Sequence, residues 1–183
     1  MGVLKVVEWP AKVLETRAEE VLKFDAELKR FAADMHETMV DAGGIGLASN
    51  QVGILKRVIT IYIPFQEGED NRQEVKEPWH DIKYTLVNPE IIKTKDRCTG
   101  QEGCLSFPGI YEFVGRHKEI WLKYYDENGK IHEMHASGLF SVCVQHEIDH
   151  IDGIVFMDRM SKLKADSVRK KVAKRVRLSK DAL

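Results

Sequence analysis

Residues 138–150 carry the pattern that most restricts how this chain can fold. A glycine is followed by apolar residues at the three- and four-residue spacing of an α-helix. The resulting stripe consists of Leu139, Val142, Cys143, His146 and His150. Both histidines therefore share the apolar face that packs against the rest of the protein. Because a buried polar group without a partner is costly, the fold has to supply partners for both imidazoles.

A divalent metal ion would satisfy both histidines at once. Positions i and i+4 lie one turn apart on the same helix face, so His146 and His150 can bind a single cation. The carboxylate of Glu147, slightly rotated from that face, can reach a water on the metal without being a ligand. Two histidines that are merely hydrogen-bonded are the alternative. The paired arrangement with its intervening glutamate favours a metal-dependent hydrolase and does not separate a protease from other hydrolases.

A catalytic metal usually has three protein ligands and one position open for water. Cys104 is the better candidate for the third ligand, because it follows Gly103 in a short predicted loop where glycine permits close backbone approach. A small buried apolar residue is the alternative for Cys104, and it is the role we expect for Cys98 and Cys143. The remaining histidines are expected to be solvated or hydrogen-bonded: His36, His80, His117, His132 and His135.

A second loop, residues 43–51, is rich in glycine. In a dinucleotide-binding fold such glycines follow a strand and open a helix, whereas these follow a predicted helix and lead towards a strand. We therefore do not expect a nucleotide site. One interpretation is a helix exit followed by an edge strand. The functional alternative is a loop that lies against a substrate backbone and presents the side-chain amide of Gln51 as a donor.

The other elements mix strands and helices without regular alternation, which favours an α+β fold. Asp25 is expected to cap a helix that ends near Ala42. Strands are predicted at residues 57–63, 84–87, 90–93, 119–126 and 130–136, and Asn128-Gly129 forms the last hairpin turn. A further helix is predicted at residues 161–178, and residues 64–84 form a long polar segment. We expect small mixed or antiparallel sheets packed around the metal-binding helix.

The length of 183 residues suits one domain, residues 1–183, which can bury a core without a metal. Three cysteines fit a reducing compartment. A net charge of −1 and the lack of a long apolar stretch give no reason to expect DNA or membrane partners. Residues 161–183 contain nine Lys or Arg and two Asp, so this tail is +7 and the remainder −8. The tail is either a solvated helix face or a contact for phosphate-rich RNA.

Three segments together resemble the peptide deformylase family. They are GIGLASNQ at residues 44–51, EGCLS at residues 102–106 and QHEIDH at residues 145–150. The segments occur in the order of the family and at similar separations, and the resemblance covers nearly the whole chain. The chain departs from the family at two places. Ser49 stands where the family commonly has alanine, which should matter little for a small residue. The segment at residues 64–84 is longer than usual, which concerns local loop geometry and not the chemistry.

The resemblance implies a bacterial cytoplasmic enzyme that removes the formyl group from the N-terminal formyl-methionine of nascent polypeptides and releases formate. It implies one divalent metal, natively Fe(II), for which Zn, Ni or Co can substitute. The implied metal ligands are Cys104, His146 and His150. Hydroxide on the metal would attack the formyl carbon, with Glu147 as general base and then general acid.

The same resemblance assigns stabilisation of the developing oxyanion to the Gln51 side chain and the Leu105 backbone N–H. The methionine side chain would need an apolar pocket beside the metal. Its expected substrate-binding residues are Gly44, Ile45, Gly46, Gly103, Leu139, Val142 and Cys143. In some family members a C-terminal helix helps the enzyme reach the ribosome, which supports the RNA-contact alternative for residues 161–178.

Three rival functions differ in their metal site or charge. An endopeptidase of the His-Glu-x-x-His type would cut internal peptide bonds and usually takes a histidine or carboxylate as its third ligand. A structural metal would have four protein ligands, and only three convincing ones are found in the sequence. An RNA-binding module would rely on the basic tail, but the acidic remainder of the chain argues against it.

Overall fold

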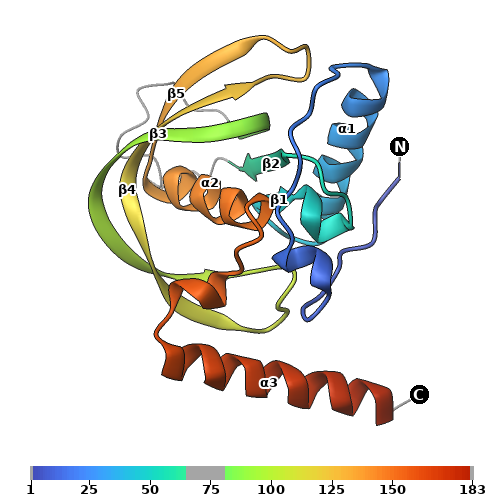
Figure 1. Ribbon diagram of the computed structural model, residues 1–183, viewed down its shortest axis with the longest axis vertical. Coiled ribbons are helices and arrows are strands. Elements are labelled where there is room, and N and C mark those ends of the chain that lie inside the picture. Colours follow the sequence, from blue (N-terminus) through green and yellow to red (C-terminus); the bar gives the residue numbers. More distant parts are fainter. Residues whose placement is uncertain (1, 65–80, 182–183) are drawn as a thin grey trace.

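Helix α2 (Gly138–Ile151) runs through the middle of the molecule, and the other elements wrap around it (Figure 1). The computed structural model describes residues 2–64 and 81–181, with side chains described as far as residue 175. Eleven of the fourteen residues of α2 are buried. Such complete burial is typical of a helix enclosed by the core rather than lying on its surface. The helix predicted from residues 138–150 is confirmed.

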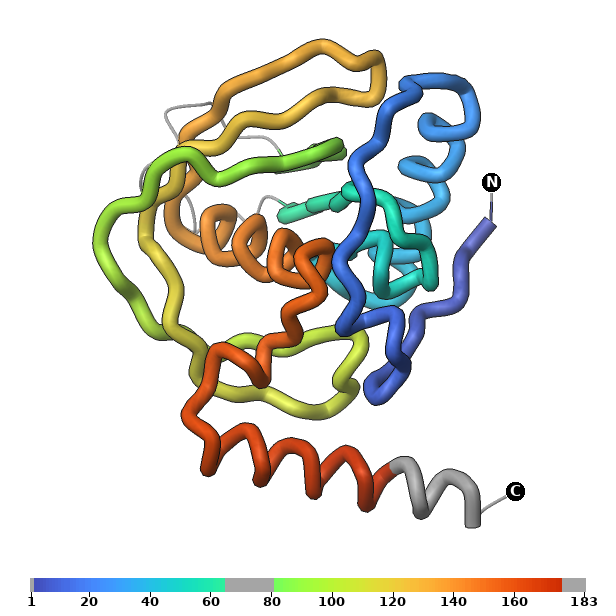
Figure 2. The backbone as a smooth tube through the Cα atoms, in the orientation of Figure 1, coloured from blue at the N-terminus to red at the C-terminus, as the bar shows by residue number. Residues whose placement is uncertain are grey.

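The described strands form one antiparallel sheet in the order β1-β2-β3-β4-β5. Their bounds are β1 (Gly46–Ala48), β2 (Val58–Ile63), β3 (Ile82–Gly103), β4 (Tyr111–Tyr125) and β5 (Ile131–Ser137). The long strands β3 and β4 curl around α2, as the backbone tube shows (Figure 2). The α+β class is confirmed, and the small sheets that we expected are joined into one.

Strand β3 corrects two expectations about residues 84–103. The two short strands predicted at residues 84–87 and 90–93 both belong to this single strand of 22 residues. Its register with β4 shifts between Val87 and Glu90, where Asn88 has a φ of 50°. An irregularity of this kind bends a strand without ending it. Gly103, which we expected in a loop, is the last residue of the strand, and the loop begins at Cys104.

Helix α1 (Ala26–Asp41) begins where the sequence predicts. The Asp25 carboxylate accepts hydrogen bonds from the backbone N–H groups of Glu27 and Leu28, both at 3.0 Å. These bonds satisfy two of the donors that a helix start leaves unpaired. Helix α1 packs against β1 and β2 through a cluster that includes Met35, Met39 and Leu47.

Helix α3 (Lys162–Asp181) lies along one end of the molecule (Figure 1). Ala165, Val168 and Val172 are buried in a cluster with Phe107 and Val114, which come from the β3–β4 connection and the start of β4. The helix predicted at residues 161–178 is therefore present, and its apolar stripe covers the segment that carries Cys104.

Three short 3-10 helices, η1 (Lys12–Glu15), η2 (Ser49–Val52) and η3 (Phe156–Arg159), complete the described elements. Among the helices described, none is long and apolar enough to cross a membrane. The polar segment expected at residues 64–84 falls mostly outside the described residues.

Candidate active site

Cys104, His146 and His150 meet at one point beside α2. Their sulfur and ring-nitrogen donor atoms all lie within 4.8 Å of one another, and Cys104 Sγ is 3.2 Å from His150 Nε2. Donor atoms around a tetrahedral zinc ion are separated by about 3.5 Å, so small shifts would seat a cation among these three. One thiol and two imidazoles suit a transition metal such as iron or zinc better than magnesium or calcium.

Two ordered elements bring these donors together. His146 and His150 lie one turn apart on α2, and their rings are 5.0 Å apart between centroids. Cys104 is the first residue after β3, at the start of a turn in which the Phe107 N–H donates to the Cys104 carbonyl at 2.9 Å. Phe107 is fully buried and packs edge-on against Phe156. The turn that presents Cys104 is thus anchored in the core.

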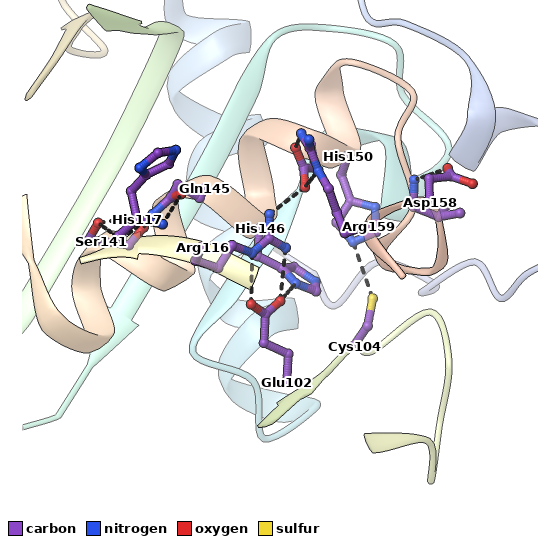
Figure 3. Close-up of polar contacts among 12 residues, drawn as sticks. Glu102, Cys104, Arg116, His117, Ser141, Gln145, His146, His150, Asp158 and Arg159 are labelled. Carbon is purple, nitrogen blue, oxygen red and sulfur yellow. Dashed lines mark hydrogen bonds and ion pairs between the residues drawn. The ribbon is translucent and has the colours of Figure 1, made fainter. Parts of the chain in front are cut away.

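Glu102 links His146 to a buried ionic network, a role that our sequence-based expectations missed (Figure 3). Its Oε2 is 2.8 Å from His146 Nδ1, and Arg116 donates from Nε and Nη2 to the two carboxylate oxygens at 2.8 and 2.9 Å. A carboxylate on Nδ1 fixes the ring and leaves Nε2 directed at a metal. Burial alone would raise the pKa of Glu102, but the bonds from Arg116 and His146 outweigh it and lower the pKa to about 2.

Arg116 extends this network across α2. Its Nη1 donates to Asp149 Oδ2 at 2.5 Å, and Arg159 binds the same carboxylate. The side chains of Arg116, Glu102 and Asp149 are all at most 7 % exposed. Asp149 therefore lies behind the metal ligands, paired with two arginines. The sequence does indicate where the Arg116 side chain lies. Arg116 is an even number of residues from the inward-facing Ile120 and Leu122 on β4, so its side chain lies on the same face of the strand.

Glu147 projects into the space between α2 and β1. Its Oε2 has no hydrogen-bond partner among the described residues, although the side chain is buried. A Cβ added at Gly46 would lie 2.4 Å from Glu147 Oε1, so only glycine at this position leaves room for the carboxyl group. Burial raises the pKa of Glu147 to about 7. A carboxyl group with such a pKa can both accept and release a proton near neutral pH.

Gln51 points its amide towards Cys104. The Gln51 Oε1 accepts from the Ala48 N–H at 2.8 Å, which leaves Nε2 as the outward donor, 3.6 Å from Cys104 Sγ and 3.3 Å from Ser106 Oγ. Two features of the glycine-rich segment agree with what we expected, while its contact with a substrate backbone stays a prediction. It is a helix exit followed by the edge strand β1, and it brings an amide donor to the candidate metal site.

A cavity of about 580 Å³ opens beside these residues. Its lining includes Cys104, Leu105, His146, Glu147 and Gln51. It also includes every residue predicted for the methionine pocket: Gly44, Ile45, Gly46, Gly103, Leu139, Val142 and Cys143. A mainly apolar cavity with a few convergent polar groups is typical of a ligand site. Within it, burial raises the pKa of the Cys143 thiol, which therefore stays neutral and forms part of the wall.

Most histidines outside this site make ordinary polar contacts, as we expected. His36 contacts Thr85 Oγ1 at 3.1 Å, while His132 and His135 contact Asp126 and Glu119, each at 2.9 Å. His117 lies away from the metal ligands (Figure 3). His80 falls outside the described residues. No described histidine other than His146 and His150 joins the metal-ligand group.

Over nearly its whole length the chain is similar to proteins of one known family. A family model described as polypeptide deformylase matches residues 3–166. A peptide deformylase from Alkalilimnicola ehrlichii is 44% identical over 97% of this chain and 93% of its own length. One from Helicobacter acinonychis is 38% identical over 94% of each chain.

Solved structures give the same result. The crystal structure of an Ehrlichia chaffeensis peptide deformylase in complex with actinonin has a TM-score of 0.86 and 36% identity, and the match covers 96% of this chain and 98% of that one. A Thermus thermophilus peptide deformylase gives a TM-score of 0.81 at 35% identity over 99% of this chain and all of its own. Sequence and structure together show that this chain belongs to the peptide deformylase family.

Proposed function

We propose that this protein removes the formyl group from the N-terminal formyl-methionine of nascent polypeptides in the bacterial cytoplasm. The observation that carries the proposal is the apolar cavity. Its lining includes two of the three candidate metal ligands, Cys104 and His146, together with a carboxyl group and an amide donor. A methionine side chain fits the apolar wall, and the hydrolytic groups converge where the attached formyl group would lie. Membership of the family points to the same reaction, with the whole chain, residues 1–183, as one catalytic domain.

Cys104, His146 and His150 would hold the metal, with Fe(II) as the native ion and Zn, Ni or Co as substitutes. When bound, the cation would lower the pKa of water and polarise the formyl group. Glu147 takes the proton from the attacking water and later returns it to the leaving amine. Burial raises the pKa of this carboxyl group, which favours its holding the proton between the two transfers. Glu102 keeps the His146 ring turned towards the ion.

Two donors stabilise the charge that develops on the formyl oxygen. Gln51 Nε2 already faces Cys104, and the N–H of Leu105 belongs to the residue that follows that ligand. Fixed donors of this kind contribute most when they are in place before the reaction. The bond from the Val7 N–H to the Gln51 carbonyl, at 2.7 Å, and that from the Trp9 N–H to the Ser106 carbonyl, at 3.0 Å, hold the two segments in place.

The decisive assay measures formate released from formyl-Met-Ala-Ser by protein prepared without oxygen. We expect one formate for each free amino terminus formed, and loss of the activity when a chelator removes the metal. Acetyl-Met-Ala-Ser and an unmodified decapeptide serve as control substrates, and neither should be cut. Cleavage of the decapeptide without formate release would instead identify the endopeptidase that we kept as a rival.

We also propose that α3 contacts the ribosome, the source of the substrate. Its apolar side is buried in the core, and Arg175 and Lys171 pair with Glu8 and Glu112. Among the described lysines of α3, Lys162, Lys164, Lys170 and Lys174 are exposed and lie outside these ion pairs. Basic side chains on one helix can bind RNA phosphates, with an affinity that falls steeply as salt increases.

Changing these four lysines to glutamine should weaken ribosome binding at least tenfold in a sedimentation assay at low salt. Turnover of formyl-Met-Ala-Ser should stay within about twofold, because none of the four lies in the catalytic cavity. A matched variant would neutralise four exposed cations elsewhere: Lys23, Lys29, Arg30 and Lys118. Equal losses in both variants would mean that the contact depends on overall charge and that α3 has no special part in it.

A further inference from the structure

Large exposed apolar side chains border the mouth of the catalytic cavity. On β4, Tyr111 is 64% exposed and Phe113 is 57% exposed. Ile45 and Leu139, in the cavity lining, are 38% and 37% exposed. Isolated exposed apolar residues are ordinary, but a group of them beside a ligand cavity marks a binding surface.

Tyr111 is fixed in position by its cross-strand neighbour. It pairs with Gly103, the residue immediately before Cys104. A Cβ at Gly103 would lie 2.7 Å from Tyr111 Cε1, so the ring lies directly on the glycine backbone. Both residues line the cavity. The ring therefore forms a flat apolar wall next to a metal ligand.

Phe113 continues this wall away from the metal. It lies two residues beyond Tyr111 on β4, on the same face of the strand, and pairs with Gln101 on β3. We call the surface made by Tyr111 and Phe113, with Gly103 and Gln101 opposite them, the aromatic strip. It extends from the cavity mouth along the β3–β4 hairpin.

The aromatic strip contains no charged side chain. Glu102 and Glu112 alternate with its members along β3 and β4, so they face the other side of the hairpin. Glu102 is buried against Arg116, and Glu112 pairs with Lys171 at 3.6 Å. An apolar side chain laid on the strip would leave water favourably. A charged one would lose hydration and meet only the neutral amide of Gln101, with no opposite charge in the strip.

A bound substrate has to leave the cavity along its mouth. With the formyl-methionine inside, an extended chain advances about 3.3 Å per residue and turns alternate side chains to opposite sides. The residues that first reach the mouth are the second and third of the substrate. We infer that the aromatic strip selects substrates at these two positions, favouring apolar or aromatic side chains over charged ones. The inference rests on the proposed deformylase function and specifies which nascent chains this protein processes fastest.

The test uses two peptide series, formyl-Met-Xaa-Ser and formyl-Met-Ala-Xaa, with Xaa as Ala, Leu, Phe, Asp or Lys. At one position at least, kcat/KM should be about tenfold higher for Phe or Leu than for Asp or Lys, a ratio that a partly buried apolar contact can produce. Because the contact also exists before the reaction, most of the difference should lie in KM.

Three variants assign the preference to the strip. Tyr111→Ala and Phe113→Ala should reduce the ratio of Phe to Asp substrates to within about twofold when combined, whereas Tyr111→Phe should retain it. Ile131→Ala removes a side chain of similar exposure on β5, outside the cavity, and should leave the ratio unchanged. Thermal unfolding of each variant checks that the hairpin remains folded.

Each contrary result has a distinct meaning. If formyl-Met-Ala-Ser releases formate and all Xaa substrates react alike, the inference is wrong and the deformylase function stands. A preference that survives loss of both aromatic rings also rejects the strip as its origin. Failure to release formate from every peptide rejects the deformylase function and this inference with it.

Discussion

Glu147→Gln is expected to lower kcat for formate release by about 10²–10⁴-fold, the range that a positioned general acid–base contributes. Glutamine has almost the same shape, so it fits beside Gly46 where a larger residue would not. It cannot take a proton from the attacking water or return one to the leaving amine. The loss should fall on kcat rather than on KM, because the carboxyl group acts in the transition state and the methionine pocket stays intact.

Metal content and single-turnover formate release should be measured on the same preparation. Glu147 is not among the three ligand side chains, so Glu147→Gln should bind one metal per chain, as the unmodified protein does. Glu90→Gln removes an exposed carboxylate from β3 and should keep full activity. A fully active, metal-loaded Glu147→Gln protein would show that another group carries the proton.

Local patterns in the sequence were enough to predict the centre of this site. The spacing of His146 and His150 and the cap at Asp25 each depend on residues within one or two helical turns, and both are found as expected. The positions of Cys104 and Gln51 were harder to predict, because no short-range sequence pattern shows that two separate loops meet at one helix. Their place beside the histidines was expected mainly from the resemblance to a family, and the structure brings them there.

Longer-range features were missed for identifiable reasons. Asn88-Pro89 lies between the two short strands that we predicted, and proline cannot donate a ladder hydrogen bond. In the structure it is a bulge within β3, whose pairing with β4 resumes at Glu90. The network of Glu102, Arg116 and Asp149 depends on that register and on how α2 packs against the sheet. Neither can be obtained from the spacing of single residues.

The largest effect on stability is expected from Arg116→Met, at about 3–5 kcal/mol, the cost of breaking a buried ion pair by removing one partner. Methionine fills a similar length of apolar space but leaves Glu102 and Asp149 without their shared cation. Arg159→Met is the matched control, because it contacts the same Asp149 from a side chain that is 44% exposed. That control should cost about 1 kcal/mol or less.

Urea denaturation of the protein freed of metal by a chelator measures both variants, and pH distinguishes a charge effect from lost packing. The network lowers the pKa of Glu102 from 4.5 to about 2, so its stabilisation is complete above pH 4.5 and declines as the pH falls towards 2. The stability gap between the unmodified protein and Arg116→Met should therefore narrow below pH 4.5. If the difference in unfolding free energy between the unmodified protein and Arg116→Met does not change with pH, the variant loses stability through packing. In that case Glu102 would orient His146 without depending on the charge of Arg116.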